Sequence, residues 1–222
     1  KSEFRVSLVG YTNAGKSTLF KALTGSNVYI ENQLFATLDT TIRKLNLDNS
    51  HTILLSDTVG FIRKLPHNLV ASFKSTLKEV IEADLIIMVL DISSPQIDDH
   101  ISTILEVLEE INADHIPVIS ALNKVDLITD FNLIKKFQRS YPEAVIISAH
   151  QHLKLSGLKN KIIKNMEESY QTIELQFSYD DGKKIAQVQE GVDVLKRDYK
   201  EKGVELKIRG SKSRINQILA SI

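Results

Sequence analysis

Cysteine is absent from the sequence of 222 residues, and so is a net charge of either sign. Without cysteine, a disulfide framework and a thiolate zinc site are both excluded, which fits a reducing compartment such as the cytoplasm. The chain carries 28 Lys and Arg residues against 28 Asp and Glu residues. No overall field therefore draws the chain to nucleic acid or to a membrane, and any such binding must use a local patch.

A long hydrophobic segment is absent as well. The most apolar run covers residues 85–90 and is followed at once by Asp91, whereas a membrane helix needs about 20 apolar residues. We therefore expect no membrane contact. The chain begins at Lys1 and enters an apolar strand at Phe4, without a signal segment before it. We expect a monomeric fragment from which an N-terminal region is missing.

What the sequence does contain is an alternation of two patterns. Continuous apolar runs predict buried parallel strands at residues 4–9, 85–90, 116–122 and 145–147. Helical spacing of apolar residues predicts helices at residues 16–23, 69–83, 101–111, 133–137 and 158–166. Strands and helices that alternate in this way form βαβ units.

An edge hairpin completes the predicted sheet. Residues 42–47 and 53–55 flank the turn sequence Asp48-Asn49-Ser50, which favours an antiparallel pair. Residues 1–170 are therefore expected to form an α/β domain of three layers, with a mainly parallel sheet and one antiparallel edge strand.

A small α+β domain is expected over residues 171–222. Alternating apolar residues predict strands at residues 173–177 and 204–208. One helix is predicted between them from the helical spacing of Ile185, Val188, Val192, Leu195 and Tyr199. Gly203 ends this helix, and Ser211 is placed to cap a last helix. The expected order is strand, helix, strand, helix.

A glycine-rich motif lies between the first strand and the first helix, the context that a phosphate-binding loop requires. It consists of Gly10-Tyr11-Thr12-Asn13-Ala14-Gly15-Lys16-Ser17, with Thr18 following. Backbone N–H groups are expected to face the phosphates, Lys16 to reach the β and γ oxygens, and the Ser17 hydroxyl to bind Mg²⁺. A glycine turn that merely opens a helix is the alternative, and the flanking elements disfavour it.

Two further segments are expected to sense the γ-phosphate. Asp57-Thr58-Val59-Gly60 follows a hydrophobic strand, so that Asp57 can hold Mg²⁺ through water and the Gly60 N–H can contact the phosphate. The second segment is Phe35-Ala36-Thr37-Leu38-Asp39, in the polar stretch before the hairpin. Thr37 is the predicted second hydroxyl ligand of Mg²⁺, with Thr40 and Thr41 as competitors.

Two loops are expected to bind the base. Asn123-Lys124-Val125-Asp126 ends a buried strand, and Asp126 can accept both N–H groups of a guanine edge, which adenine does not offer. Asn123 is expected to tie loops together, and the stem of Lys124 to lie along the base. Ser148-Ala149-His150 ends the last strand, where the Ala149 N–H can meet guanine O6. Together the motifs predict binding of GTP and GDP on a P-loop GTPase fold.

Catalysis is expected to be slow without help. Many small GTPases place a water-orienting glutamine after the glycine of the second motif, but Phe61 stands there and cannot orient water. Asn13 occupies a position at which potassium-dependent GTPases coordinate a monovalent cation, and K⁺ there can replace an arginine finger. An ordinary polar loop residue is an equal alternative for Asn13.

The motifs resemble those of the HflX family of ribosome-associated GTPases. The resemblance covers nearly the whole chain, more loosely after Tyr170, and His150 departs from the lysine that GTPases usually have there. It is carried by residues 10–20, residues 35–39, the run Asp57-Thr58-Val59-Gly60-Phe61-Ile62-Arg63-Lys64-Leu65-Pro66-His67, and its continuation Leu69-Val70-Ala71-Ser72-Phe73.

The resemblance implies GTP hydrolysis linked to the splitting of stalled or idle ribosomes, with binding to the large ribosomal subunit and its RNA. It also implies Ser17 and Thr37 as Mg²⁺ ligands, and an N-terminal ribosome-contacting domain that this chain lacks. The rivals are a GTP-gated binding module, a potassium-stimulated GTPase of ribosome assembly or RNA binding, a small-molecule kinase, and the G domain of a membrane ion transporter.

Overall fold

The computed structural model describes residues 3–25, 41–58, 60 and 77–221, and it divides into two compact units. One unit covers residues 4–163, and the other is formed mainly by residues 164–222. The division falls inside helix α6 (Leu155–Ser169), a few residues before the boundary predicted at Tyr170.

The larger unit is built on a six-stranded sheet with the order β2-β3-β1-β4-β5-β6. Only β2 runs antiparallel, in register with β3, and the other neighbours are parallel. This confirms the predicted mainly parallel sheet with an antiparallel edge strand. The strands are β1 (Phe4–Val9), β2 (Thr41–Asn46), β3 (Thr52–Asp57), β4 (Leu85–Asp91), β5 (Val118–Asn123) and β6 (Val145–Ile146).

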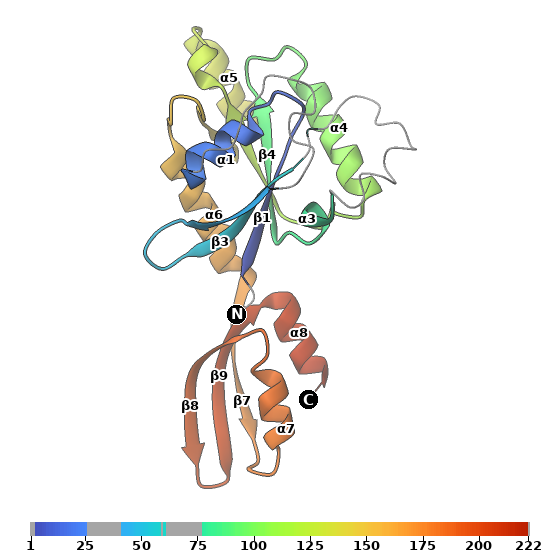
Figure 1. Ribbon diagram of the computed structural model, residues 1–222, viewed down its shortest axis with the longest axis vertical. Helices are drawn as coiled ribbons and strands as arrows, with labels where there is room; N and C mark the ends of the chain where they lie inside the picture. Colours follow the sequence, from blue (N-terminus) through green and yellow to red (C-terminus); the bar gives the residue numbers. More distant parts are fainter. Residues whose placement is uncertain (1–2, 26–40, 59, 61–76, 222) are drawn as a thin grey trace. The chain divides into compact units, whose positions relative to one another are not determined.

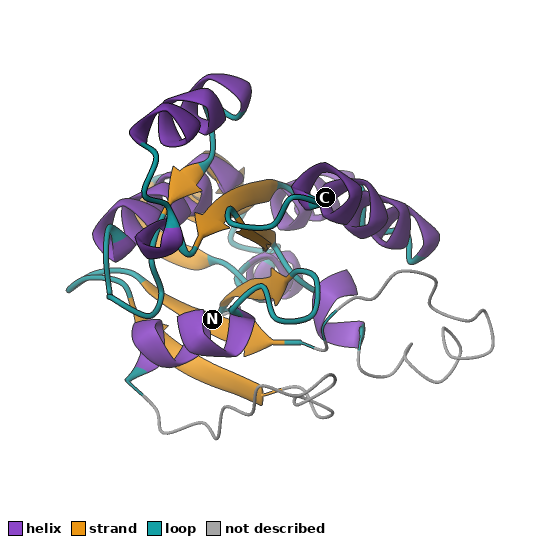
Figure 2. Ribbon diagram, turned by 90° about the horizontal axis from the view of Figure 1, so that it is seen from above, coloured by secondary structure: helices purple, strands orange, loops and turns teal. Residues whose placement is uncertain are grey.

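Helices cover both faces of this sheet, which explains why central strands such as β4 are apolar on both sides. Figures 1 and 2 show α1 and α6 on one face and α3 and α4 on the other. Ile134 and Phe137 of α5 pack against the core that α4 also covers. The helices are α1 (Lys16–Thr24), α3 (Lys78–Ile81), α4 (Ile97–Glu110), η1 (Val125–Leu127) and α5 (Phe131–Ser140). Among the described residues, no helix is both long and apolar enough to cross a membrane.

The carboxyl ends of the parallel strands meet at one edge of this sheet. The polar motifs follow β1, β3, β5 and β6 directly. Ligands of such α/β sheets bind outside these strand ends. Of the predicted helix at residues 69–83, the described part contains α3, and residues 69–76 lie outside the described residues.

The smaller unit has an antiparallel sheet with the order β7-β9-β8. Its elements are β7 (Tyr170–Phe177), α7 (Gly182–Val188), β8 (Asp193–Lys200), β9 (Gly203–Ser211) and α8 (Lys212–Ser221). Leu206 and Ile208 of β9 are fully buried and pack with Val188 of α7 and Ile215 of α8. The Ser211 hydroxyl accepts the Arg214 N–H at 3.3 Å, which is the predicted capping contact.

The predicted helix over residues 185–199 is wrong in its second half, because α7 ends at Val188 and β8 follows. Gly191, in the turn between α7 and β8, has φ 74, a left-handed conformation that a continuing helix does not allow. A β-bulge lies between Val194 and Lys196. The extra residue shifts the alternation of apolar side chains, so that Leu195 and Tyr199 fell by chance at helical spacing.

Candidate nucleotide-binding site

The glycine-rich loop runs from the end of β1 to the start of α1 and passes close to β4. A Cβ atom added at Gly10 would lie 2.4 Å from the carbonyl oxygen of Val89, so a side chain does not fit there. Gly15 has φ 96 and caps α1 in the left-handed region, and Asn13 also has a positive φ of 61. Left-handed residues next to right-handed ones turn successive backbone N–H groups to one side, which forms a concave site for an anion.

Lys16 is buried and folds back over this loop. Its Nζ donates to the carbonyl oxygens of Gly10 at 3.1 Å and Tyr11 at 3.2 Å. Burial lowers the pKa of Lys16 to about 8, although the Asp57 carboxylate acts in the opposite direction. Phosphate oxygens at this loop would compensate the charge of the ammonium better than two neutral carbonyls do.

Asp57 ends β3 beside Lys16 and is 1% exposed. Burial raises the pKa of Asp57 above its usual value, and the Ser17 hydroxyl and the Lys16 ammonium offset only part of this rise. Even so, neither carboxylate oxygen has a partner in ordinary hydrogen-bond geometry among the described residues. A buried carboxylate without partners is costly, which fits a group that serves a cation or a water on a cation.

The described residues contain no group of three or more His, Asp or Glu side chains that could hold a metal by themselves. A divalent cation at Asp57 and Ser17 would therefore need ligands from the bound nucleotide. Mg²⁺ is usually held in this way, through one or two protein oxygens, phosphates and waters. The donor set fits Mg²⁺ as a partner of the nucleotide.

Gly60 lies against the phosphate loop. A Cβ atom added there would be 2.9 Å from Cγ2 of Thr12 and 3.1 Å from Nζ of Lys16. Thr58 holds the segment after β3 against β1, because its hydroxyl donates to the Leu8 carbonyl at 2.6 Å. The structure thus brings the β3 loop and the glycine-rich loop together at the ammonium of Lys16.

Asn123 joins the phosphate loop to the two base loops. Its Nδ2 donates to the Ala14 carbonyl at 2.9 Å, and its Oδ1 accepts the Ala149 N–H at 2.9 Å. The side chain is 2% exposed, so both bonds are shielded from water. The predicted contact of the Ala149 N–H with guanine O6 stays a prediction, and it now requires that N–H to be shared between two acceptors.

The loop after β6 is closed on itself. Ser148 and Leu153 exchange backbone hydrogen bonds of 3.2 Å and 2.9 Å, and the Ser148 hydroxyl accepts the Gln151 N–H at 3.0 Å. Buried Ser148 and Ala149 face inward, whereas His150 is exposed. The exposed position agrees with His150 as a loop residue near the base.

Lys124 has a partner that sequence reasoning missed. Its Nζ lies 2.7 Å from Oδ2 of Asp91, at the end of β4. Burial works to raise the pKa of Asp91, but the bonds from Lys124 and Ser93 outweigh it and hold the pKa below its usual range. The acidic residue directly after an apolar run was the available signal. Asp126 is exposed, with its carboxylate unbonded by any described residue.

A second contact that sequence reasoning missed fixes the side chain of Tyr11. Its ring stacks on the His100 ring of α4, with centroids 4.0 Å apart and an angle of 14° between the planes. The carbonyl of the same residue holds Lys16. Aromatic pairs of this kind are worth about 1 kcal/mol beyond burial, so α4 helps to position the phosphate loop.

Several predicted site residues lie outside the described residues. Thr41 is described and lies at the start of β2. The undescribed ones are Phe35, Ala36, Thr37, Leu38, Asp39, Thr40, Val59 and Phe61.

The glycines at the two ends of α1 allow a matched test of the loop. Both have positive φ, but a Cβ at Gly15 would lie 2.3 Å from Nδ2 of Asn123, whereas a Cβ at Gly25 would meet nothing within 4 Å. We expect Gly25→Ala to cost about 1–2 kcal/mol, the usual penalty of the left-handed region. Gly15→Ala should cost more and weaken GTP binding at least tenfold. Urea denaturation and nucleotide titration measure both, and equal effects of the two variants would contradict this reading of the Asn123 contacts.

The sheet order and the loops at its carboxyl edge define the P-loop GTPase class. Residues 5–124 match the model of the 50S ribosome-binding GTPases, and the chain belongs to that family. Within it, the resemblance to the HflX GTPases is confirmed. The chain is 42% identical over 222 residues to the GTPase HflX of Gluconacetobacter diazotrophicus, covering 100% of this chain and 49% of that protein.

Solved structures support the same fold. A GTP-binding protein from the archaeon Sulfolobus solfataricus in complex with GDP is 30% identical, with a TM-score of 0.59 over 74% of this chain and 53% of that one. Era in complex with MgGDPNP and nucleotides 1506–1542 of 16S ribosomal RNA is 28% identical, with a TM-score of 0.58 over 73% of this chain and 56% of that one. The chain spans about half the length of the curated relatives it matches.

Proposed function

We propose that this chain binds GTP with Mg²⁺ and hydrolyses it to GDP. The observation that carries the proposal is the buried pair of Lys16 and Asp57 at the ends of the phosphate loop and β3, with both carboxylate oxygens of Asp57 unpartnered. In this arrangement the Lys16 ammonium can bind a phosphate, and the Asp57 carboxylate can bind the cation that accompanies it. Membership of a GTPase family supports the same activity.

In the proposed complex, Ser17 would hold Mg²⁺ directly and Asp57 would hold it through water, with Thr37 as the expected third protein group. Bound Mg²⁺ would neutralise charge that develops on the β and γ oxygens. Lys16 leaves the carbonyls of Gly10 and Tyr11 for the phosphates, and the loop N–H groups cradle them. The Gly60 N–H contacts the γ-phosphate.

Water attacks the γ-phosphorus in line with the leaving oxygen, while Lys16 and the backbone cradle stabilise the transition state. Phe61 cannot orient this water, so we expect slow intrinsic turnover. At the base, the Asp126 carboxylate selects guanine by accepting the two N–H groups of the guanine edge. Lys124 is held by Asp91 so that its stem is positioned along the base.

The large ribosomal subunit and its RNA are the proposed partners, and the splitting of stalled or idle ribosomes in the cytoplasm is the proposed outcome. The description of the family as 50S ribosome-binding supports this, as do the HflX relatives and the RNA complex of the related Era. We propose a monomer in solution.

The deciding experiment is GTP hydrolysis in potassium buffer with and without purified large ribosomal subunits. We expect slow turnover alone and stimulation by the subunits. Unchanged turnover with subunits, together with absence of the chain from pelleted subunits, would count against the ribosomal partner and leave the GTPase assignment standing.

A potassium-stimulated mechanism is the second candidate, favoured by the exposed Asn13 at φ 61 within the phosphate loop. We expect about tenfold or faster turnover in KCl than in NaCl, because a cation near the phosphates replaces a missing positive group. Asn13→Gly keeps the backbone conformation and removes the amide oxygen, and it should abolish the difference. Equal turnover of the unmodified chain in the two salts would exclude this role.

A further inference from the structure

Positive and negative charge are separated along the larger unit. Residues 97–123 contain six Asp and Glu residues and neither Lys nor Arg. Residues 131–163 contain six Lys and Arg residues and one acidic residue, Glu143. The basic side chains of this second segment, here called the basic face, are Lys135, Lys136, Arg139, Lys154, Lys159 and Lys161. They come from α5, α6 and the loop between β6 and α6.

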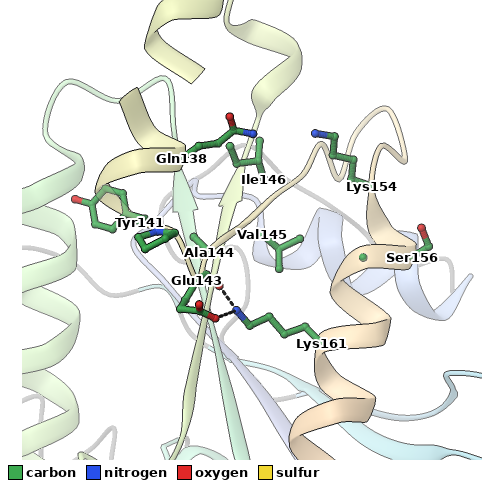
Figure 3. A pocket seen from close by; sticks show the side chains of 11 residues that line it. Gln138, Tyr141, Glu143, Ala144, Val145, Ile146, Lys154, Ser156 and Lys161 are labelled. Carbon is green, nitrogen blue, oxygen red and sulfur yellow. Dashed lines mark hydrogen bonds and ion pairs between the residues drawn. The ribbon is translucent and has the colours of Figure 1, made fainter. Parts of the chain in front are cut away.

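A groove lies at the free edge of the sheet, and Lys154 and Lys161 of the basic face line it. Its volume is about 660 Å³, and its lining includes Tyr141, Val145, Lys154, Gly157 and Lys161. Strand β6 is the last strand of the sheet, and the groove lies beside it, between the end of α5 and the start of α6 (Figure 3). A hollow of this size holds one or two nucleotide units.

One cation at this groove is paired with an exposed carboxylate. Lys161 contacts the Glu143 carbonyl and lies 2.9 Å from its carboxylate, which is 93% exposed. An ion pair this exposed is worth little, so a phosphate can replace it. The other five cations of the basic face form no ion pair with an acidic side chain among the residues that the structure describes. Lys154 has φ 57, so it is fixed in a conformation that a lysine seldom adopts.

Gly157 adds a steric observation. It is the third residue of α6, and glycine is a poorer helix former than alanine. A Cβ atom there would meet only Val145 Cγ1 at 3.8 Å, an ordinary contact, so packing within the chain does not require the glycine. A ligand that approaches the helix backbone closely would require it.

We propose that this groove and the basic face bind the phosphodiester backbone of RNA. The inference deepens the proposed function, on which the choice of an RNA partner rests. Protein interfaces usually bury apolar or aromatic anchors at their centre and keep charges at the rim. Here Lys154 and Lys161 line the hollow itself, beside Tyr141 and Val145, and the three cations of neighbouring α5 are exposed. Several cations around one hollow fit a partner with charge at regular intervals along its length.

The test compares two double variants in the binding of a labelled RNA hairpin, followed by fluorescence anisotropy over a range of KCl concentrations. Lys154→Gln with Lys161→Gln removes two groove cations, and Lys183→Gln with Lys184→Gln removes two exposed cations of α7 in the smaller unit. We expect the groove variant to bind about tenfold more weakly and to lose about two units of salt slope. The α7 variant should bind like the unmodified chain.

Gly157→Gln provides a second readout without a change of charge. Because its Cβ has room, we expect the thermal midpoint to stay the same or rise, while RNA binding weakens several-fold through steric block. A fall in the midpoint together with unchanged RNA binding would contradict the steric argument. Each variant is also titrated with GTP, to check that the nucleotide site remains formed.

The proposal is overturned if the groove and α7 variants bind RNA equally, or if the unmodified chain binds no RNA. Competition by polyglutamate as effective as by RNA at equal charge would indicate an acidic protein instead. Pelleting with large subunits separates this inference from the proposed function. If the groove variant still pellets with the subunits, the groove is refuted as the RNA-binding surface and the ribosomal partner stands. If the unmodified chain binds RNA but does not pellet with the subunits, only the ribosomal partner is refuted.

Discussion

Lys16→Ala is expected to slow GTP hydrolysis by about 10³-fold or more, because it removes a positive charge aimed at the developing transition state. The variant should still fold. The ammonium is buried on two neutral carbonyls, and its lowered pKa shows that burial disfavours the charge. Single-turnover hydrolysis measures the catalytic loss, and thermal unfolding of the nucleotide-free chain measures the structural one.

Lys21→Ala is the matched control for this experiment. Lys21 lies on the same helix, α1, but in its last turn, and it is exposed. We expect it to leave turnover within a factor of about two, as for most exposed positions. Turnover by Lys16→Ala equal to that of Lys21→Ala would refute the assignment of the phosphate site.

Asp126→Asn is expected to lower GTP affinity by about 10²-fold or more and to improve the binding of xanthosine triphosphate. The carboxylate accepts two guanine N–H groups, whereas an amide offers one acceptor and one donor. Xanthine presents the complementary pair, an N–H and a carbonyl, and mismatched hydrogen-bonding groups are strongly rejected. Titration of both nucleotides against both proteins measures the exchange of preference.

Asp130→Asn is the control four residues along the chain. Asp130 caps α5 by accepting the Asn132 N–H at 2.8 Å, and asparagine caps a helix about as well. Both substitutions remove one negative charge from the same exposed region. A similar loss of GTP affinity in the two variants would point to general electrostatics, and an unchanged preference in Asp126→Asn would refute base recognition by Asp126.

The mainly parallel sheet and its antiparallel edge strand followed from the sequence because two-sided burial leaves a clear mark, whereas the order of the strands did not. Residues 85–90 are apolar without interruption, and β4 is buried between helices on both faces. The half-exposed hairpin of β2 and β3 was visible through its turn at residues 48–50, where Asp48 Oδ1 accepts the Ser50 N–H at 2.8 Å. Motifs at fixed spacing placed Lys16 at the start of a helix, and Asp57 and Asn123 at strand ends.

What the sequence concealed depends on contacts between distant residues. The stack of Tyr11 on His100 has no local signature, and Asp91 after its apolar run gives no sign that Lys124 is its partner. Each contact joins segments that only the folded sheet brings together. The error at β8 has a different origin. A single bulge residue at Leu195 is enough to convert an alternating pattern into an apparently helical one.

The separation of charge in the larger unit has a consequence for how the chain approaches a partner. With a formal net charge of +0, it is neither attracted nor repelled as a whole. Within the larger unit, the acidic segment 97–123 and the basic segment 131–163 nevertheless place opposite charges on different elements. A polyanion acts on such charges within a screening length of about 8 Å in physiological salt. It would attract the basic segment and repel the acidic one, so that encounter is oriented without being generally sticky.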